Sequence, residues 1–169
     1  HVWISNKKVD EDYKCWTHYN KNGKLLKYIY RSIYDGALVN NKVRSIAGLQ
    51  PCKNLSGETQ MAYAKANGEG WNIDKASIWM LINWLLLLSG RSTDTQSVSG
   101  TGRHTGGSQQ NNNQLNSGDG NQKGMFYGDN ANGIVKVFHI ENWWGNIWKI
   151  INGIILKDSK LHVKMTPNT

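Results

Sequence analysis

ENWWGNIW, residues 141–148, combines three Trp residues with a Gly-Asn pair. Gly145 and Asn146 permit left-handed backbone geometry, so a tight turn is expected at this point. Indole rings on both sides of a turn can pack on a core and fix the loop in place. We therefore expect Trp143, Trp144 and Trp148 to anchor this loop to the body of the protein.

Outward from this loop, strand-like runs and turn signals surround two helical segments. One helix is expected over Gln60–Asn67, capped by Ser56 or Thr59, with Gly68 at its end. A second helix is expected from the N-cap candidate Asp74 to Leu88, and its apolar stripe is wide enough to predict burial on nearly all sides. The expected strands are Val2–Ser5, Tyr13–Tyr19, Leu25–Tyr34, Ile134–Ile140, Trp148–Leu156 and Leu161–Met165, with turn signals at 20–23, 152–153 and 158–159.

Residues 89–133 form a tract of Gly, Ser, Thr, Asn and Gln. Few of its side chains could enter a core, so a long irregular loop is expected. Loops of this length are usually functional or disordered, and this composition is also typical of adaptable binding surfaces. The alternative is a disordered tract or one that packs between subunits. The candidate ligand-binding residues are Arg91, Arg103, His104, Asn111, Asn112, Asn113 and Tyr127.

The 141–148 run resembles the Asn-x-x-Gly-Asn-x-x-Glu-Trp signature of the formylglycine-generating-enzyme (sulfatase-modifying factor) branch of C-type lectin-like folds. Asn142, Gly145 and Asn146 match it, and Trp148 stands at the family's common aromatic position. The wider layout is similar to phage and prophage structural proteins that carry this fold. The residues of this fold signature are Gly70, Trp71, Glu141, Asn142, Trp143, Trp144, Gly145, Asn146, Trp148 and Gly153.

The resemblance implies an α+β chain with a C-type lectin-like fold. Two helices would pack on small antiparallel sheets, with a long irregular loop insertion over 89–133. Residues 1–44 would form N-terminal strands at a junction to an upstream region, and residues 45–169 the lectin-like domain. The chain begins with His1 rather than Met, so we expect it to be a piece of a longer polypeptide.

The resemblance also implies a non-enzymatic virion protein on the surface of a bacteriophage particle. Such a domain would sit at the tip of a tail or head fibre, form a homotrimer, contact other virion proteins and bind a host-surface glycan or protein. An alternative is a structural or decoration protein whose loop packs between subunits. A formylglycine-generating oxidase is disfavoured because Lys149 and Ile150 replace the family's Glu and Trp, and because both cysteines, Cys15 and Cys52, precede the signature, whereas the family's catalytic cysteines follow it.

Charge and hydropathy exclude several classes of partner. The net charge of +8 permits an anionic partner, but the cations do not concentrate in one arm, so we expect no nucleic-acid partner. The most apolar run, Ile78–Leu88, is shorter than the roughly 20 residues that span a bilayer, so no membrane insertion is expected.

No cofactor is expected, because the five His residues are scattered without metal-ligand spacing. Calcium is an alternative, with Asp119, Asp129, Asn142 and Asn146 as oxygen ligands. We expect Asn142 and Asn146 to hydrogen-bond turn backbone instead. Whether the two cysteines pair stays open.

Overall fold

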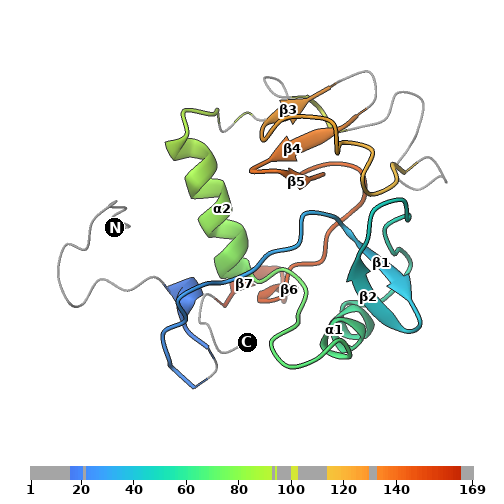
Figure 1. Cartoon of the computed structure of the whole chain (residues 1–169). Coiled ribbons are helices and arrows are strands. Elements are labelled where there is room, and N and C mark those ends of the chain that lie inside the picture. Colours follow the sequence, from blue (N-terminus) through green and yellow to red (C-terminus); the bar gives the residue numbers. More distant parts are fainter. Residues whose placement is uncertain are drawn as a thin grey trace.

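The computed structural model describes residues 16–20, 22–92, 94, 100–102, 114–129 and 133–164. In these ranges the protein is a small α+β structure with two α-helices and three small antiparallel sheets, β1–β2, β3–β4–β5 and β6–β7 (Figure 1). This coarse prediction is confirmed. The elements are η1 (Trp16–His18), β1 (Gly36–Val39), β2 (Lys42–Ser45), α1 (Gly57–Lys65), α2 (Ala76–Leu88), β3 (Tyr127–Gly128), β4 (Val135–Val137), β5 (Ile140–Glu141), β6 (Ile154–Lys157) and β7 (Lys160–Val163).

Both predicted helices are present, and their N-terminal caps differ. The Ser56 hydroxyl accepts a hydrogen bond from the Thr59 N–H at 3.1 Å, so of the two predicted N-caps of α1 Ser56 is confirmed and Thr59, which lies within the helix, was wrong. The helix ends at the C-cap Ala66, so the predicted end at Gly68 was wrong as well. For α2 the N-cap residue is Lys75, without a side-chain cap bond. The Asp74 cap was wrong, because its carboxylate is engaged by the Arg31 guanidinium at 2.5 Å.

Beyond its first turn, where Ala76 and Ser77 are buried, helix α2 is buried on one side, so the prediction of burial on nearly all sides was wrong. Ile82 and Leu86 are buried in a core cluster with Val137, Ile140 and Trp143, on the side where the β3–β4–β5 sheet lies in Figure 1. A second stripe at i, i+4 and i+8 is exposed and consists of Met80, Trp84 and Leu88. Neither helix within the described ranges has the length and apolarity required to span a membrane.

Three hairpins turn through pairs of non-glycine residues with positive φ. The pairs are Asn40-Asn41, Phe138-His139 and Asp158-Ser159. Two central residues with positive φ define a type I′ turn, whose backbone twist matches the right-handed twist of the two strands it connects. The predicted single strand Ile134–Ile140 was therefore wrong: the chain reverses at Phe138-His139 and β5 pairs back onto β4. The Phe138 ring packs edge-on to Phe126 with centroids 4.9 Å apart, which stabilises the turn through tertiary contact.

The N-terminal part is less regular than predicted. Where it is described, the turn predicted at residues 20–23 is present: Asn20 Oδ1 accepts from the N–H groups of Asn22 and Lys24, and the Asn20 carbonyl accepts from the Gly23 N–H. The strand Leu25–Tyr34 was wrong: an isolated bridge joins Leu25 to Tyr19, and the rest of that segment is irregular. The strand expected over 13–19 is replaced, where described, by η1, and the Val2–Ser5 strand lies outside the described residues. The domain division at residue 44 stays a prediction, and β2 runs across it.

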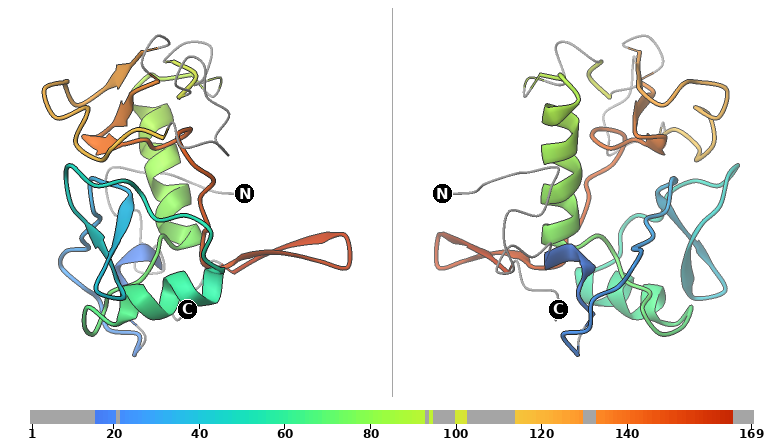
Figure 2. Two further views of the ribbon diagram at one scale, coloured as in Figure 1. Left: turned by 90° about the vertical axis from the view of Figure 1, so that its right-hand side faces the viewer. Right: turned by 60° about the vertical axis from the view of Figure 1, so that its left-hand side comes forward.

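The β6–β7 hairpin projects from the body of the molecule (Figure 2). Its strands begin later than the predicted Trp148–Leu156 run, because residues 148–153 are irregular apart from a bridge between Asn152 and Lys75. The hairpin's apolar side chains are exposed to solvent, namely Ile155, Leu156, Leu161 and Val163. The hairpin is attached to the body of the molecule at the start of α2, where the Asn152 carbonyl oxygen accepts the Ala76 N–H at 2.8 Å.

Candidate functional site

The loop after β5 is anchored at its start and exposed at its end. Trp143 is buried, its indole N–H donates to Asn83 Oδ1 at 3.0 Å, and its ring stacks on Trp79. Trp144 donates to the Gly100 carbonyl at 2.9 Å. The prediction that Trp148 anchors the loop was wrong, because its side chain is 83% exposed at the rim of a polar cleft.

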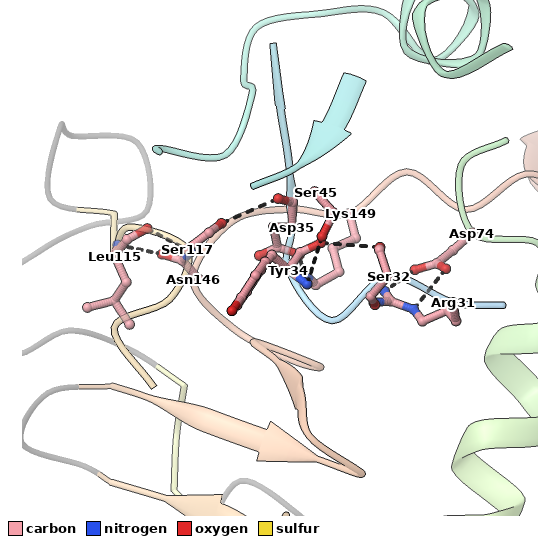
Figure 3. A network of polar contacts seen from close by, with 10 residues as sticks. All are labelled: Arg31, Ser32, Tyr34, Asp35, Ser45, Asp74, Leu115, Ser117, Asn146 and Lys149. Carbon is pink, nitrogen blue, oxygen red and sulfur yellow. Dashed lines mark hydrogen bonds and ion pairs between the residues drawn. The ribbon is translucent and has the colours of Figure 1, made fainter. Parts of the chain in front are cut away.

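Gly145 and Asn146 form the expected left-handed turn, with φ of 78° and 58°. A Cβ on Gly145 would lie 2.0 Å from the Gly102 carbonyl oxygen, so two backbone segments cross here in direct contact. The Asn146 amide bonds the Leu115 backbone, accepting its N–H at 2.9 Å and donating to its carbonyl at 3.4 Å (Figure 3). Asn146 therefore bonds backbone as predicted, although the backbone belongs to a distant segment.

Two buried charged residues, Lys136 and Glu141, hold the segment 114–124 against the β3–β4–β5 sheet through bonds to its backbone. Glu141 Oε2 and Oε1 accept the N–H groups of Gly118 and Gly120 at 2.7 and 3.0 Å. Lys136 Nζ donates to the carbonyls of Gly120 and Lys123 at 2.9 and 3.1 Å. Lys136 and Glu141 face each other in the β4–β5 register and are only 5% and 3% exposed. These contacts were not predicted, because alternation along the expected strand Ile134–Ile140 carries no signal for a buried Lys.

Three of the four oxygen ligands proposed for calcium, those of Asp119, Asp129 and Asn146, are engaged by the protein itself. Asp119 Oδ2 accepts from the Asn116 N–H, and Asp129 Oδ2 accepts from the Tyr127 hydroxyl. In the part of the chain that the structure describes, no group of three or more His, Cys, Asp or Glu side chains could hold a metal ion. Calcium binding stays an untested alternative.

Two of the seven candidate ligand-binding residues meet in one cavity, the aromatic pocket. Arg91 lies with its guanidinium carbon 4.0 Å from the ring centroid of Phe126, and Tyr127 follows in the chain. Lys123 Nζ lies 4.7 Å from the Tyr127 ring centroid. The cavity has a volume of about 210 Å³ and is lined by Leu86, Arg91, Phe126, Tyr127, Gly128, Lys136, Val137 and Trp144. The other candidates, Arg103, His104, Asn111, Asn112 and Asn113, lie outside the described residues.

A second cavity, the polar cleft, has a volume of about 140 Å³ and was not predicted. Arg31 makes two bonds to the Asp74 carboxylate, at 3.1 and 2.5 Å, and Lys149 pairs with Asp35 (Figure 3). The cleft is also lined by Tyr34, Ser45, Cys52, Gln60, Trp71, Asn72 and Trp148. Trp71 and Trp148 are signature residues, but the remaining lining comes from segments far apart in the chain.

Cys52 lines the polar cleft with a raised thiol pKa. Burial raises the pKa of Cys52 above its ordinary value of 9.0; a backbone hydrogen bond opposes the rise, and the Asp35 charge adds to it. The thiol is therefore protonated at neutral pH and is a weak nucleophile.

We expect Cys52 to react with iodoacetamide more slowly in the folded protein than in urea at pH 8, measured by mass spectrometry in a Cys15→Ser background. The native state holds the Cys52 thiol proton more tightly than the unfolded chain does. The protonated thiol therefore contributes to the stability of the folded state below pH 9.0, and this contribution is lost as the pH rises through the pKa of the folded state. Cys52→Ala should reduce the alkaline loss of stability. Equal labelling rates in the two states would contradict the raised pKa.

The chain matches no known family of proteins, no curated protein and no solved structure. The aromatic pocket and the polar cleft are therefore interpreted from their own geometry. The resemblance to the lectin-like phage proteins stays a prediction.

Proposed function

We propose that the protein is a non-enzymatic C-type lectin-like domain of a bacteriophage virion protein, and that it recognises a host-surface glycan at the aromatic pocket. The two helices, the small antiparallel sheets and the position of the 89–133 tract support this fold. A homotrimer at a fibre tip, in contact with other virion proteins, is part of the same proposal.

The observation that carries the proposal is the stacking of Arg91 on Phe126 beside Tyr127. A guanidinium on a ring face is held flat and still offers N–H donors to a carboxylate or phosphate. Lys123 adds a second cation next to Tyr127, whereas Lys136 is occupied by backbone carbonyls. The pocket therefore favours an acidic sugar, with aromatic faces available for the sugar ring.

The test is binding of the purified protein to an array of bacterial surface glycans that includes teichoic acids and acidic capsule fragments. Arg91→Ala should weaken binding to the acidic glycans roughly 10- to 100-fold, the range expected for a lost charged hydrogen bond. The matched control is Arg44→Ala, because Arg44 is exposed on β2 and bonds Asn67 outside the pocket. Failure of every acidic glycan to bind, or equal binding by both variants, would overturn the proposal.

The alternative function is that of a structural or decoration protein. Assembly and host adsorption of phage particles that carry a variant distinguish it from receptor binding. Particles carrying Arg91→Ala should assemble normally and adsorb poorly to host cells. Defective assembly with normal adsorption would favour the structural role. A point variant is preferable to deleting the loop, because a deletion reaching Gly118 or Gly120 would remove the partners of buried Glu141.

A further inference from the structure

Asp35, which lines the polar cleft, has a buried carboxylate oxygen without a hydrogen-bond partner among the described residues. The Asp35 side chain is only 9% exposed, and Oδ1 pairs with Lys149 Nζ. Oδ2 is buried and accepts no hydrogen bond from any described group. A buried acceptor left unsatisfied costs about 1–3 kcal/mol, and more when it is charged. A ligand that supplies a donor at this oxygen would therefore gain affinity.

The charges around Asp35 indicate a neutral donor. Arg31 with Asp74 and Lys149 with Asp35 form two closed ion pairs, so the cleft has no excess charge to attract an ionic ligand. A hydroxyl group can donate to Asp35 Oδ2 without bringing a charge into the cleft. The Lys149 ammonium has three N–H donors, and its bond to Asp35 uses one, so it can also donate to a ligand oxygen.

The rim of the cleft offers large apolar faces. Trp148 is 83% exposed and Trp71 is 53% exposed, and both line the same cavity as Asp35 and Lys149. An exposed indole at a cleft is suited to one face of a pyranose ring, which presents C–H groups, while the ring's hydroxyls bond the polar wall.

We propose that the polar cleft is a binding site for a neutral sugar, distinct from the aromatic pocket. The sugar ring stacks on Trp148, and one of its hydroxyls donates to Asp35 Oδ2. Nothing in this proposal depends on the acidic glycan proposed for the aromatic pocket, because the two cavities share no lining residue.

The experiment follows the indole N–H signals of ¹⁵N-labelled protein by NMR during titration with glucose, galactose, mannose and N-acetylglucosamine. At least one of these sugars should shift the Trp148 and Trp71 signals and leave the Trp84 signal in place, since Trp84 lies on the exposed side of α2. Trp148→Ala should weaken binding on the order of tenfold. Because Trp148 is exposed, this variant should stay folded, and Trp84→Ala is the matched control.

Asp35→Asn is the second variant, and it should weaken the same sugar on the order of tenfold because it replaces the charged acceptor. The proposal fails if none of the four sugars moves the Trp148 signal, or if Trp148→Ala binds the sugar as well as Trp84→Ala does. A response confined to Trp144, which lines the aromatic pocket, would support that pocket and overturn this site. Conversely, an Arg91→Ala variant that binds acidic glycans as well as the parent protein does would refute the acidic-glycan proposal, and the Trp148 signal would still test the polar cleft.

Discussion

Gly145→Ala is expected to lower the free energy of unfolding by about 4 kcal/mol, from positive-φ strain and overpacking together. Gly145 has φ of 78°, and its added Cβ would lie 2.0 Å from the Gly102 oxygen and 2.5 Å from the Gly102 carbonyl carbon. Both atoms are backbone, and Gly102 O also accepts the Asn146 N–H at 2.8 Å, so the contact cannot be relieved by a side-chain rotation. The midpoint temperature of thermal unfolding should fall by about 8–16 °C.

Gly70→Ala is the matched control for this crossing. Gly70 has φ of 83°, and its Cβ would meet no atom within 4 Å, so only the positive-φ cost of about 1–2 kcal/mol applies. The free energy of unfolding of both variants is measured by chemical denaturation. Equal losses of stability would show that the contact between the added Cβ and Gly102 does not contribute to the effect of Gly145→Ala.

Lys136→Met is expected to lower the free energy of unfolding by about 3–6 kcal/mol, because it removes two hydrogen bonds from a buried ammonium group, each worth about 1.5–3 kcal/mol. The carbonyls of Gly120 and Lys123 lose this donor. Circular dichroism during urea titration measures the loss. Because Lys136 and Glu141 hold residues 114–124 in place, limited proteolysis should cleave that segment faster than in the parent protein.

The control is Lys157→Met, at an exposed position on β6. Its effect on stability should lie within about 0.5 kcal/mol, as for ordinary surface substitutions. If Lys136→Met were equally mild, the bonds from Lys136 would not be what holds the segment to the sheet.

The parts of the fold that could be predicted from the sequence are those encoded by neighbouring residues. The Ser56 cap and the Gly145-Asn146 turn depend on local hydrogen bonding and backbone freedom, and both were predicted. The Phe138-His139 turn carries little local signal, because a bulky Phe is disfavoured at positive φ, and the packing of Phe138 on Phe126 is tertiary. The buried position of Lys136 likewise depends on carbonyls 13 and 16 residues away.

The candidate sites show the same division. Arg91 and Tyr127 were chosen from the composition of the 89–133 tract, and the structure brings them together at the aromatic pocket. The polar cleft was missed because its ion pairs join residues distant in the chain: Asp35 and Lys149 are 114 positions apart, and Arg31 and Asp74 are 43 apart. No local pattern could connect them.

The projecting β6–β7 hairpin implies that local stability differs within the chain. An isolated two-stranded hairpin is only marginally stable in water, and this one adds few contacts beyond its base at Gly153 and Lys164. Its ladder amides should therefore exchange with deuterium through local opening, while β4, with all three residues buried, exchanges only when the whole chain unfolds.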